Sequence, residues 1–179
     1  TVITIPNLQQ RNDADPLRPY TSQAVLKSIK LYLEKRISCH VQLHVDNPLF
    51  EEVAIKFKLQ LAQGYTDFAF YSAKLQEEIT AFLSPWAYGK GEITFGGKIY
   101  KSVLINFIEE RPYVDFILDA EMAHIDAYGQ TFNADYESIT PSTAKSILVS
   151  AASAKHVIEP APGSTTEKQY ECDYLKQFD

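Results

Sequence analysis

The chain has 179 residues, a formal net charge of -6 at pH 7 and a hydrophobic content of 45%. This length suits one well-packed domain with an appendage, and the composition is that of a globular protein. The acidic balance, with no basic run, excludes an ordinary nucleic-acid-binding surface, which needs clustered Lys and Arg. No apolar run reaches the ~18 residues that span a bilayer. We therefore expect no nucleic-acid partner and no membrane insertion.

The first 19 residues contain three prolines among polar side chains, a composition that does not hold a helix. We interpret residues 1–19 as an extended linker from an N-terminal part that the sequence does not include. A helix is expected next over residues 22–36, capped by Thr21 or Ser22, and we expect it to cover the sheet. The residues at three- and four-residue spacing along one side of it are Val25, Ile29, Tyr32, Leu33 and Arg36.

The stretch from residue 40 to 61, HVQLHVDNPLFEEVAIKFKLQL, is the one around which the chain is organised. Apolar and polar residues alternate in both of its arms, as in half-buried strands. Asp46-Asn47-Pro48 between the arms is typical of a turn. The pattern therefore predicts an antiparallel hairpin of strands 40–46 and 52–61. The buried face of the second strand is expected to carry Val53, Ile55, Phe57, Leu59 and Leu61.

Two further helices are predicted, over residues 66–83 and 101–109. Asp67 can cap the first of them, and Ser84-Pro85 ends it. The glycine-rich stretch 89–98 between the helices lacks the Lys-Ser/Thr pair of a phosphate-binding P-loop. We interpret it as a turn, a short strand and a second turn.

A third major strand is expected over residues 112–124, paired beside the hairpin. Its alternation places Val114, Phe116, Leu118, Ala120 and Met122 on one face and Asp115, Ile117, Asp119 and Glu121 on the other. Residues 146–150 predict a short strand, and residues 156–158 predict another.

These elements predict an α+β fold: a mainly antiparallel sheet with helices packed on one face. A ferredoxin-like arrangement is the first expectation among several strand orders. We expect residues 20–126 to form the core domain and residues 127–160 to attach to it as a loop and short strands. Residues 161–179 are expected to be a loose C-terminal tail.

No metal site and no cofactor site are expected. His40 and His44 are four residues apart, but on a strand that spacing separates them by about 13 Å, which is too far to hold one ion. Cys39 and Cys172 are expected to remain reduced thiols. His124 and His156 are interpreted as structural residues.

No catalytic residue is expected either. The sequence contains no nucleophile motif such as G-x-S-x-G or H-E-x-x-H. Asp115, Asp119 and Glu121 share a strand face, and paired carboxylates can perform acid and base chemistry. An acidic strand face that is solvated or faces a partner is the preferred interpretation, with a hydrolase kept as an alternative.

An alternative function from a different class is a small-ligand or peptide-binding module. Aromatic residues are frequent in ligand sites. The surface considered for this module comprises Tyr65, Tyr71, Trp86, Tyr88 and Tyr100.

An ordered set of motifs extends from about Pro16 to about Met122 and carries a family resemblance. The set consists of PLRPYT, LYLEKRIS, VQLHVDNPLFEEVAIKFKLQL, FLSPW, ITFGGKIYKSVLINFIEE and YVDFILDAEM, with SILVSAASAKHVI fitting after them. Together they resemble the C-terminal part of a baseplate J-like protein, the wedge component of contractile phage tails and contractile injection systems. Proteins of that family are several times longer, so the chain would correspond to the distal C-terminal domain.

The resemblance implies a non-enzymatic structural subunit that mediates wedge assembly and couples it to sheath contraction. The implied partners are other wedge proteins, hub proteins and the sheath. The implied location is the cytoplasm during assembly, followed by the finished phage tail or injection particle. No catalytic, cofactor-binding or metal-binding residue is implied.

Overall fold

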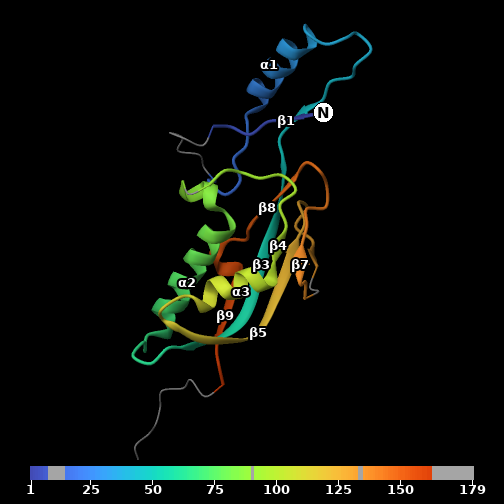
Figure 1. Ribbon diagram of the computed structural model, residues 1–179. Coiled ribbons are helices and arrows are strands. Elements are labelled where there is room, and N and C mark those ends of the chain that lie inside the picture. Colours follow the sequence, from blue (N-terminus) through green and yellow to red (C-terminus); the bar gives the residue numbers. More distant parts are fainter. Residues whose placement is uncertain (8–14, 90, 133–134, 163–179) are drawn as a thin grey trace, which may run out of the picture.

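The computed structural model describes residues 1–7, 15–89, 91–132 and 135–162. Its architecture is α+β, as predicted: two helices cover one face of a five-stranded sheet, and a third helix projects beyond one end (Figure 1). None of the helices within the described ranges is long and apolar enough to cross a membrane. From residue 163 onward the expected tail lies outside the described residues.

The central strand is β3, Leu49–Leu61, which pairs antiparallel with β5, Val114–Ile125. This pairing confirms the predicted neighbour relation between the two long strands. On its other side β3 pairs in parallel with β8, Ser146–Ser150, and then with β9, Val157–Pro160. The sheet order is β6-β5-β3-β8, with β9 beside β3 and with β6 at Thr131–Phe132. The short strands expected near residues 146–150 and 156–158 are therefore present.

The predicted hairpin over residues 40–61 is wrong. Only β2, Val45–Asp46, is a strand in its first arm, and it pairs in parallel with β1, Val2–Ile3. Both sides of β3 are already occupied by β5, β8 and β9, so no position is left for an arm that folds back. The Asn47 side chain hydrogen-bonds both the N–H and the C=O of Thr21 (2.8 and 2.9 Å) instead of capping a hairpin turn.

The two covering helices are α2, Phe68–Leu83, and α3, Lys101–Glu109, which confirms both predictions. Asp67 caps α2, because its side chain accepts a hydrogen bond from the N–H of Phe70 at 3.0 Å. The predicted strand within the glycine-rich stretch is wrong, since Glu92, Ile93 and Thr94 belong to no strand. The strand that follows, β4, Ile99–Tyr100, pairs instead with β7, Ser138–Ile139.

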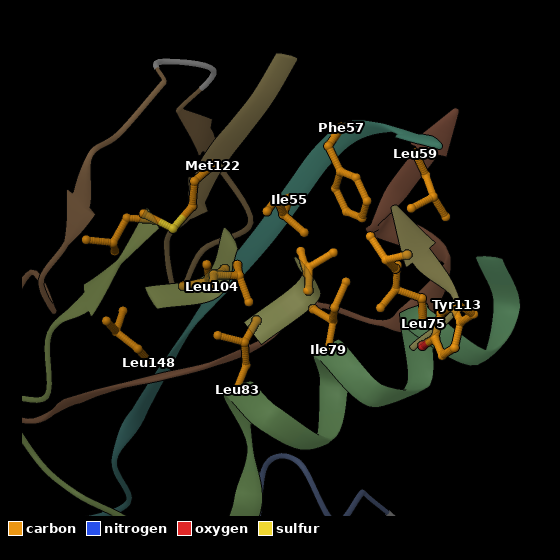
Figure 2. Close-up of a cluster of buried hydrophobic side chains, with 14 residues drawn as sticks. Ile55, Phe57, Leu59, Leu75, Ile79, Leu83, Leu104, Tyr113, Met122 and Leu148 are labelled. Atoms are coloured by element: carbon orange, nitrogen blue, oxygen red, sulfur yellow. The ribbon is translucent and has the colours of Figure 1, made fainter. Parts of the chain in front are cut away.

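The core lies between the sheet and these two helices (Figure 2). The predicted phase of β3 is confirmed at four positions, since Val53, Ile55, Phe57 and Leu59 are all buried. The cluster also contains Leu75, Ile79 and Leu83 of α2, Leu104 and Ile108 of α3, and Tyr113, Val114 and Met122. Burial raises the pKa of Tyr113, whose hydroxyl donates to Glu78 at 2.9 Å.

The predicted alternation of β5 is confirmed at Val114, Ala120 and Met122, which pack in the core, but it is wrong between them, over residues 116–118. Two bulges insert extra residues into β5, one between the partners of Lys56 and Lys58 and the other between those of Gln60 and Leu61. Each bulge reverses which side chains face the core. As a result Ile117 packs on the core, whereas Phe116 and Leu118 are exposed on the opposite face. Asp119 lies in the first bulge with φ at 51°, a left-handed conformation that Asp tolerates.

The first helix, α1, Gln23–Glu34, forms close to its predicted bounds but does not cover the sheet. It contacts β2 and lies beyond the upper end of the sheet (Figure 1). Of its residues only Leu26 is buried. The amphipathic pattern was sound evidence for a helix, but it could not specify which surface the helix would meet.

Candidate functional site

A buried carboxylate, Glu51, gathers polar groups at the start of β3. It accepts hydrogen bonds from the Ser142 N–H and hydroxyl, and it lies 2.8 Å from Nε2 of His124. Burial raises the pKa of Glu51, but hydrogen bonds from Ser142, Ser146 and His124 outweigh it and hold the pKa below its usual value. Because the Ser142 hydroxyl donates to the carboxylate and not to the imidazole, the trio lacks the geometry that activates a serine nucleophile.

A second serine and histidine pair lies between β8 and β9. The Ser150 hydroxyl is 2.9 Å from Nε2 of His156, and both residues are completely buried. Nδ1 of His156 accepts a hydrogen bond from the N–H of Ile55, which places the proton on Nε2. An imidazole in that tautomer donates to the serine and cannot take its proton. The expected structural role of His156 is the one that this geometry supports.

The candidate metal ligands lie in the segment between α1 and β2. His40, His44 and Cys39 are all exposed there, and residues 41–44 form no strand. Within the described ranges no group of three or more His, Cys, Asp or Glu residues could hold a metal ion. Cys39 is a free thiol, whereas Cys172 lies outside the described residues.

The bulges of β5 change the expected acidic face, although Asp119 and Glu121 still line one shallow pocket. Asp119 forms an ion pair with Lys58 at 2.6 Å, while Asp115 and Glu121 are exposed. The expected grouping with Ile117 on one face is wrong, because Ile117 packs on the core. Sequence alternation cannot locate a bulge, so it could not show that Ile117 leaves this face.

The five aromatic residues considered for a ligand surface do not gather at one place. Tyr65 and Tyr71 pack against Tyr113 at the core, with ring centroids 6.4 and 5.2 Å from it. Trp86 is buried with Phe50, Ile147 and Val149 at the other end of the sheet. Only Tyr88 and Tyr100 of the five are exposed.

One exposed apolar surface lies on the projecting helix. Val25, Leu31 and Tyr32 of α1 are exposed, and Arg36 stacks on the Tyr32 ring at 3.6 Å. We call residues 20–48, which include α1 and the segment leading to β3, the arm. The Asn47 side chain connects the end of the arm to its beginning through Thr21. Sequence reasoning assigned this helix to the core and so missed its exposure.

A second exposed surface is the face of the sheet opposite α2 and α3, which we call the open face. The register places Gln60 beside Phe116, Lys58 beside Leu118 and Ala54 beside Ala123 on it. A concavity of about 620 Å³ lies over the two alanines, bordered by Lys56, Glu121 and Val157. The bulges create this surface by turning Phe116 and Leu118 away from the core.

A projecting helix, an open sheet face and internally satisfied polar clusters are features of a protein that contacts other proteins. Comparison with known proteins agrees, because the family model for baseplate proteins of the PVC11-like type matches residues 1–151. The class of the chain is therefore that of a baseplate protein. Specifically, it belongs to the PVC11-like baseplate protein family.

A solved structure with a similar fold is the cryo-EM structure of the anti-feeding prophage (AFP) baseplate, 6-fold symmetrised. The TM-score is 0.56 at 17% sequence identity, and the match covers 76% of this chain and 27% of that chain. This chain therefore corresponds to about a quarter of the length of the solved chain. None of the curated proteins matches the sequence.

Proposed function

We propose that the chain is a wedge subunit that mediates baseplate assembly and couples it to sheath contraction. We further propose that it corresponds to the C-terminal domain of a baseplate J-like protein. The ordered motifs from Pro16 to Met122 support this finer assignment, and membership of a baseplate family supports the general one. We also propose that residues 1–19 form an extended linker, because three prolines lie among polar side chains there.

The observation that carries the assembly role is the exposed arm. This helix buries one residue and exposes Val25, Leu31 and Tyr32. Contact of these apolar side chains with water is unfavourable in free energy, and a partner that covers them would remove it. The proposed partners are other wedge proteins, hub proteins and the sheath. Residues 20–126 serve as the main domain, which begins with the arm, and residues 127–160 are attached to it. Assembly takes place in the cytoplasm, before the subunit becomes part of the particle.

No catalytic, cofactor-binding or metal-binding residue is assigned in this proposal. The polar clusters around Glu51 and His156 are assigned to stability, because their donors and acceptors satisfy one another. The aromatic ligand-binding alternative has little support, since three of its five residues pack inside the protein.

The proposal is tested by a tagged pull-down from a lysate of the source cell, with quantitative mass spectrometry. Baseplate, tube and sheath proteins should be enriched with the wild-type chain and depleted with an arm variant, Leu31→Asp with Tyr32→Asp. Lys74→Glu on the outer surface of α2 is the control and should behave as the wild type. Recovery of none of these proteins, from a lysate shown to contain them, would contradict the proposal.

A further inference from the structure

The open face carries large apolar side chains that the helices of the chain do not cover. Phe116 is 41% exposed, Leu118 is 42% exposed and Val157 is 42% exposed. Val157 borders a concavity of about 620 Å³ on the same face, whose floor includes Ala54 and Ala123, and these small side chains leave room for larger ones from a partner. Apolar groups grouped around a concavity are typical of a surface that receives a helix.

The outer side of α1 also carries exposed apolar side chains, which are complementary to those of the open face. Leu31 is 51% exposed and Tyr32 is 57% exposed. The exposed cations of the arm, Lys27, Lys30, Lys35 and Arg36, surround them. An amphipathic helix with apolar anchors and flanking lysines suits an apolar groove with acidic borders.

Charge is separated between these two parts of the molecule. The arm, residues 20–48, contains four Lys or Arg against two Asp or Glu, whereas the described residues from 49 to 162 contain eight Lys or Arg against fifteen Asp or Glu. The lysines that line the open face are already paired: Lys56 with Glu159, Lys58 with Asp119 and Lys155 with Glu52. Within the described part of the chain no cation pairs with Glu121. The body of the protein is therefore electrostatically complementary to its own arm.

The arm cannot reach the open face of its own molecule. Its helix contacts β2, and it lies beyond the end of the sheet, away from the middle of β3 where Ala54 lies (Figure 1). We propose that α1 of one copy docks on the open face of a second copy of this chain. The proposal names one partner within the proposed assembly role and rests on it. Because the two contacting surfaces differ, the contact is heterologous and joins copies into a ring or a chain of subunits.

The test is sedimentation analysis of the 179-residue chain over a range of concentrations at low and high salt. The wild type should associate, and added salt should weaken the association because the arm is basic and the body acidic. Leu31→Asp with Tyr32→Asp (the arm variant) and Phe116→Asp with Leu118→Asp (the face variant) should each lower the association constant about tenfold or more. Lys74→Glu should leave it unchanged. Circular dichroism checks folding, and the milder Glu121→Lys should weaken association without removing any apolar side chain.

Mixing the two variants identifies the contact directly. Each variant keeps one intact surface. The intact arm of the face variant should therefore bind the intact face of the arm variant, and association should end at the dimer. A wild-type chain that stays monomeric up to about 1 mM at low salt overturns the proposal, and so does a mixture that stays monomeric. A monomeric chain that still recovers baseplate proteins in the pull-down overturns this inference and leaves the proposed function standing.

Discussion

Nδ1 of His156 accepts a hydrogen bond from the backbone N–H of Ile55 at 3.3 Å, and this contact fills a gap in the sheet. The gap lies between β8 and β9, which pair with β3 on either side of it. The N–H of Ala151 donates to the C=O of Val53 at 2.9 Å, so a loop and an imidazole replace a strand along this part of β3. The replacement satisfies backbone groups that would otherwise be buried without partners.

This contact makes stability depend on pH. Burial lowers the pKa of His156 from 6.5 to about 4. Between these values the unfolded chain binds a proton that the folded chain does not, so the free energy of unfolding should decrease as the pH falls from 6.5 to about 4. The expected loss is about 3 kcal/mol. Urea denaturation at closely spaced pH values measures it.

His156→Asn is the matched control for this pH dependence. Its side-chain oxygen can accept the Ile55 N–H, but the group does not titrate. The variant should lose about 1 to 2 kcal/mol at neutral pH and show a flatter profile between pH 6.5 and about 4. An unchanged slope in the variant would mean that other groups cause the acid destabilisation.

Glu51 contributes in a lower pH range. Because its pKa is held below 4.5 in the folded protein, its contribution is complete above that value and is lost as the pH falls through the folded pKa. Glu51→Gln should cost about 1 to 3 kcal/mol at neutral pH, since a buried charged acceptor for Ser142 is lost. The measurement is thermal unfolding near pH 7 and below pH 4. A variant as stable as the wild type would contradict the role assigned to this carboxylate.

The bulges of β5 predict an inverted pattern of substitution costs. Ile117→Ala should cost about 2 kcal/mol because Ile117 packs on the core, whereas Phe116→Ala should cost less than about 1 kcal/mol despite removing more atoms. Denaturant unfolding of both variants, measured side by side, checks the order. The opposite order would restore the plain alternation predicted from the sequence.

The core face of β3 gives a sharper contrast between neighbouring residues. Phe57 is buried in the main cluster, so Phe57→Ala should cost about 3 to 5 kcal/mol. Lys58→Ala should cost almost nothing, because its ion pair with Asp119 lies at the surface. Equal costs, measured by chemical denaturation, would show that the orientation of the strand is wrong.

Alternation and amphipathic periodicity predicted the two long strands, all three helices and the core phase of β3. These patterns gave wrong predictions where the position of a segment depends on residues far from it in the sequence. The residues 40–46 alternate like a strand, but β5, β8 and β9 occupy both sides of β3 and leave no place for them. Phe116 and Leu118 look like core residues until the bulges reverse them. The exposure of Val25, Tyr32, Phe116 and Leu118 was missed for these reasons, since the pattern of these residues predicted burial.

The contact between Asn47 and Thr21 predicts that one side chain orders the base of the arm. Asn47→Ala removes both hydrogen bonds, and the arm should open locally at a cost of about 1 to 2 kcal/mol. Hydrogen exchange should become faster in α1 and stay unchanged in β3. Faster exchange throughout the chain would mean that the arm and the body unfold together.

The most direct test of the assembly role is electron microscopy of particles from source cells that do not produce this chain. The same cells are then made to produce it again, and their particles are compared. Cells without it should yield few or no particles with a complete baseplate and an attached sheath. The wild-type chain and Lys74→Glu should restore such particles, whereas Leu31→Asp with Tyr32→Asp should not. Complete, contractile particles in normal number without the chain would contradict the account.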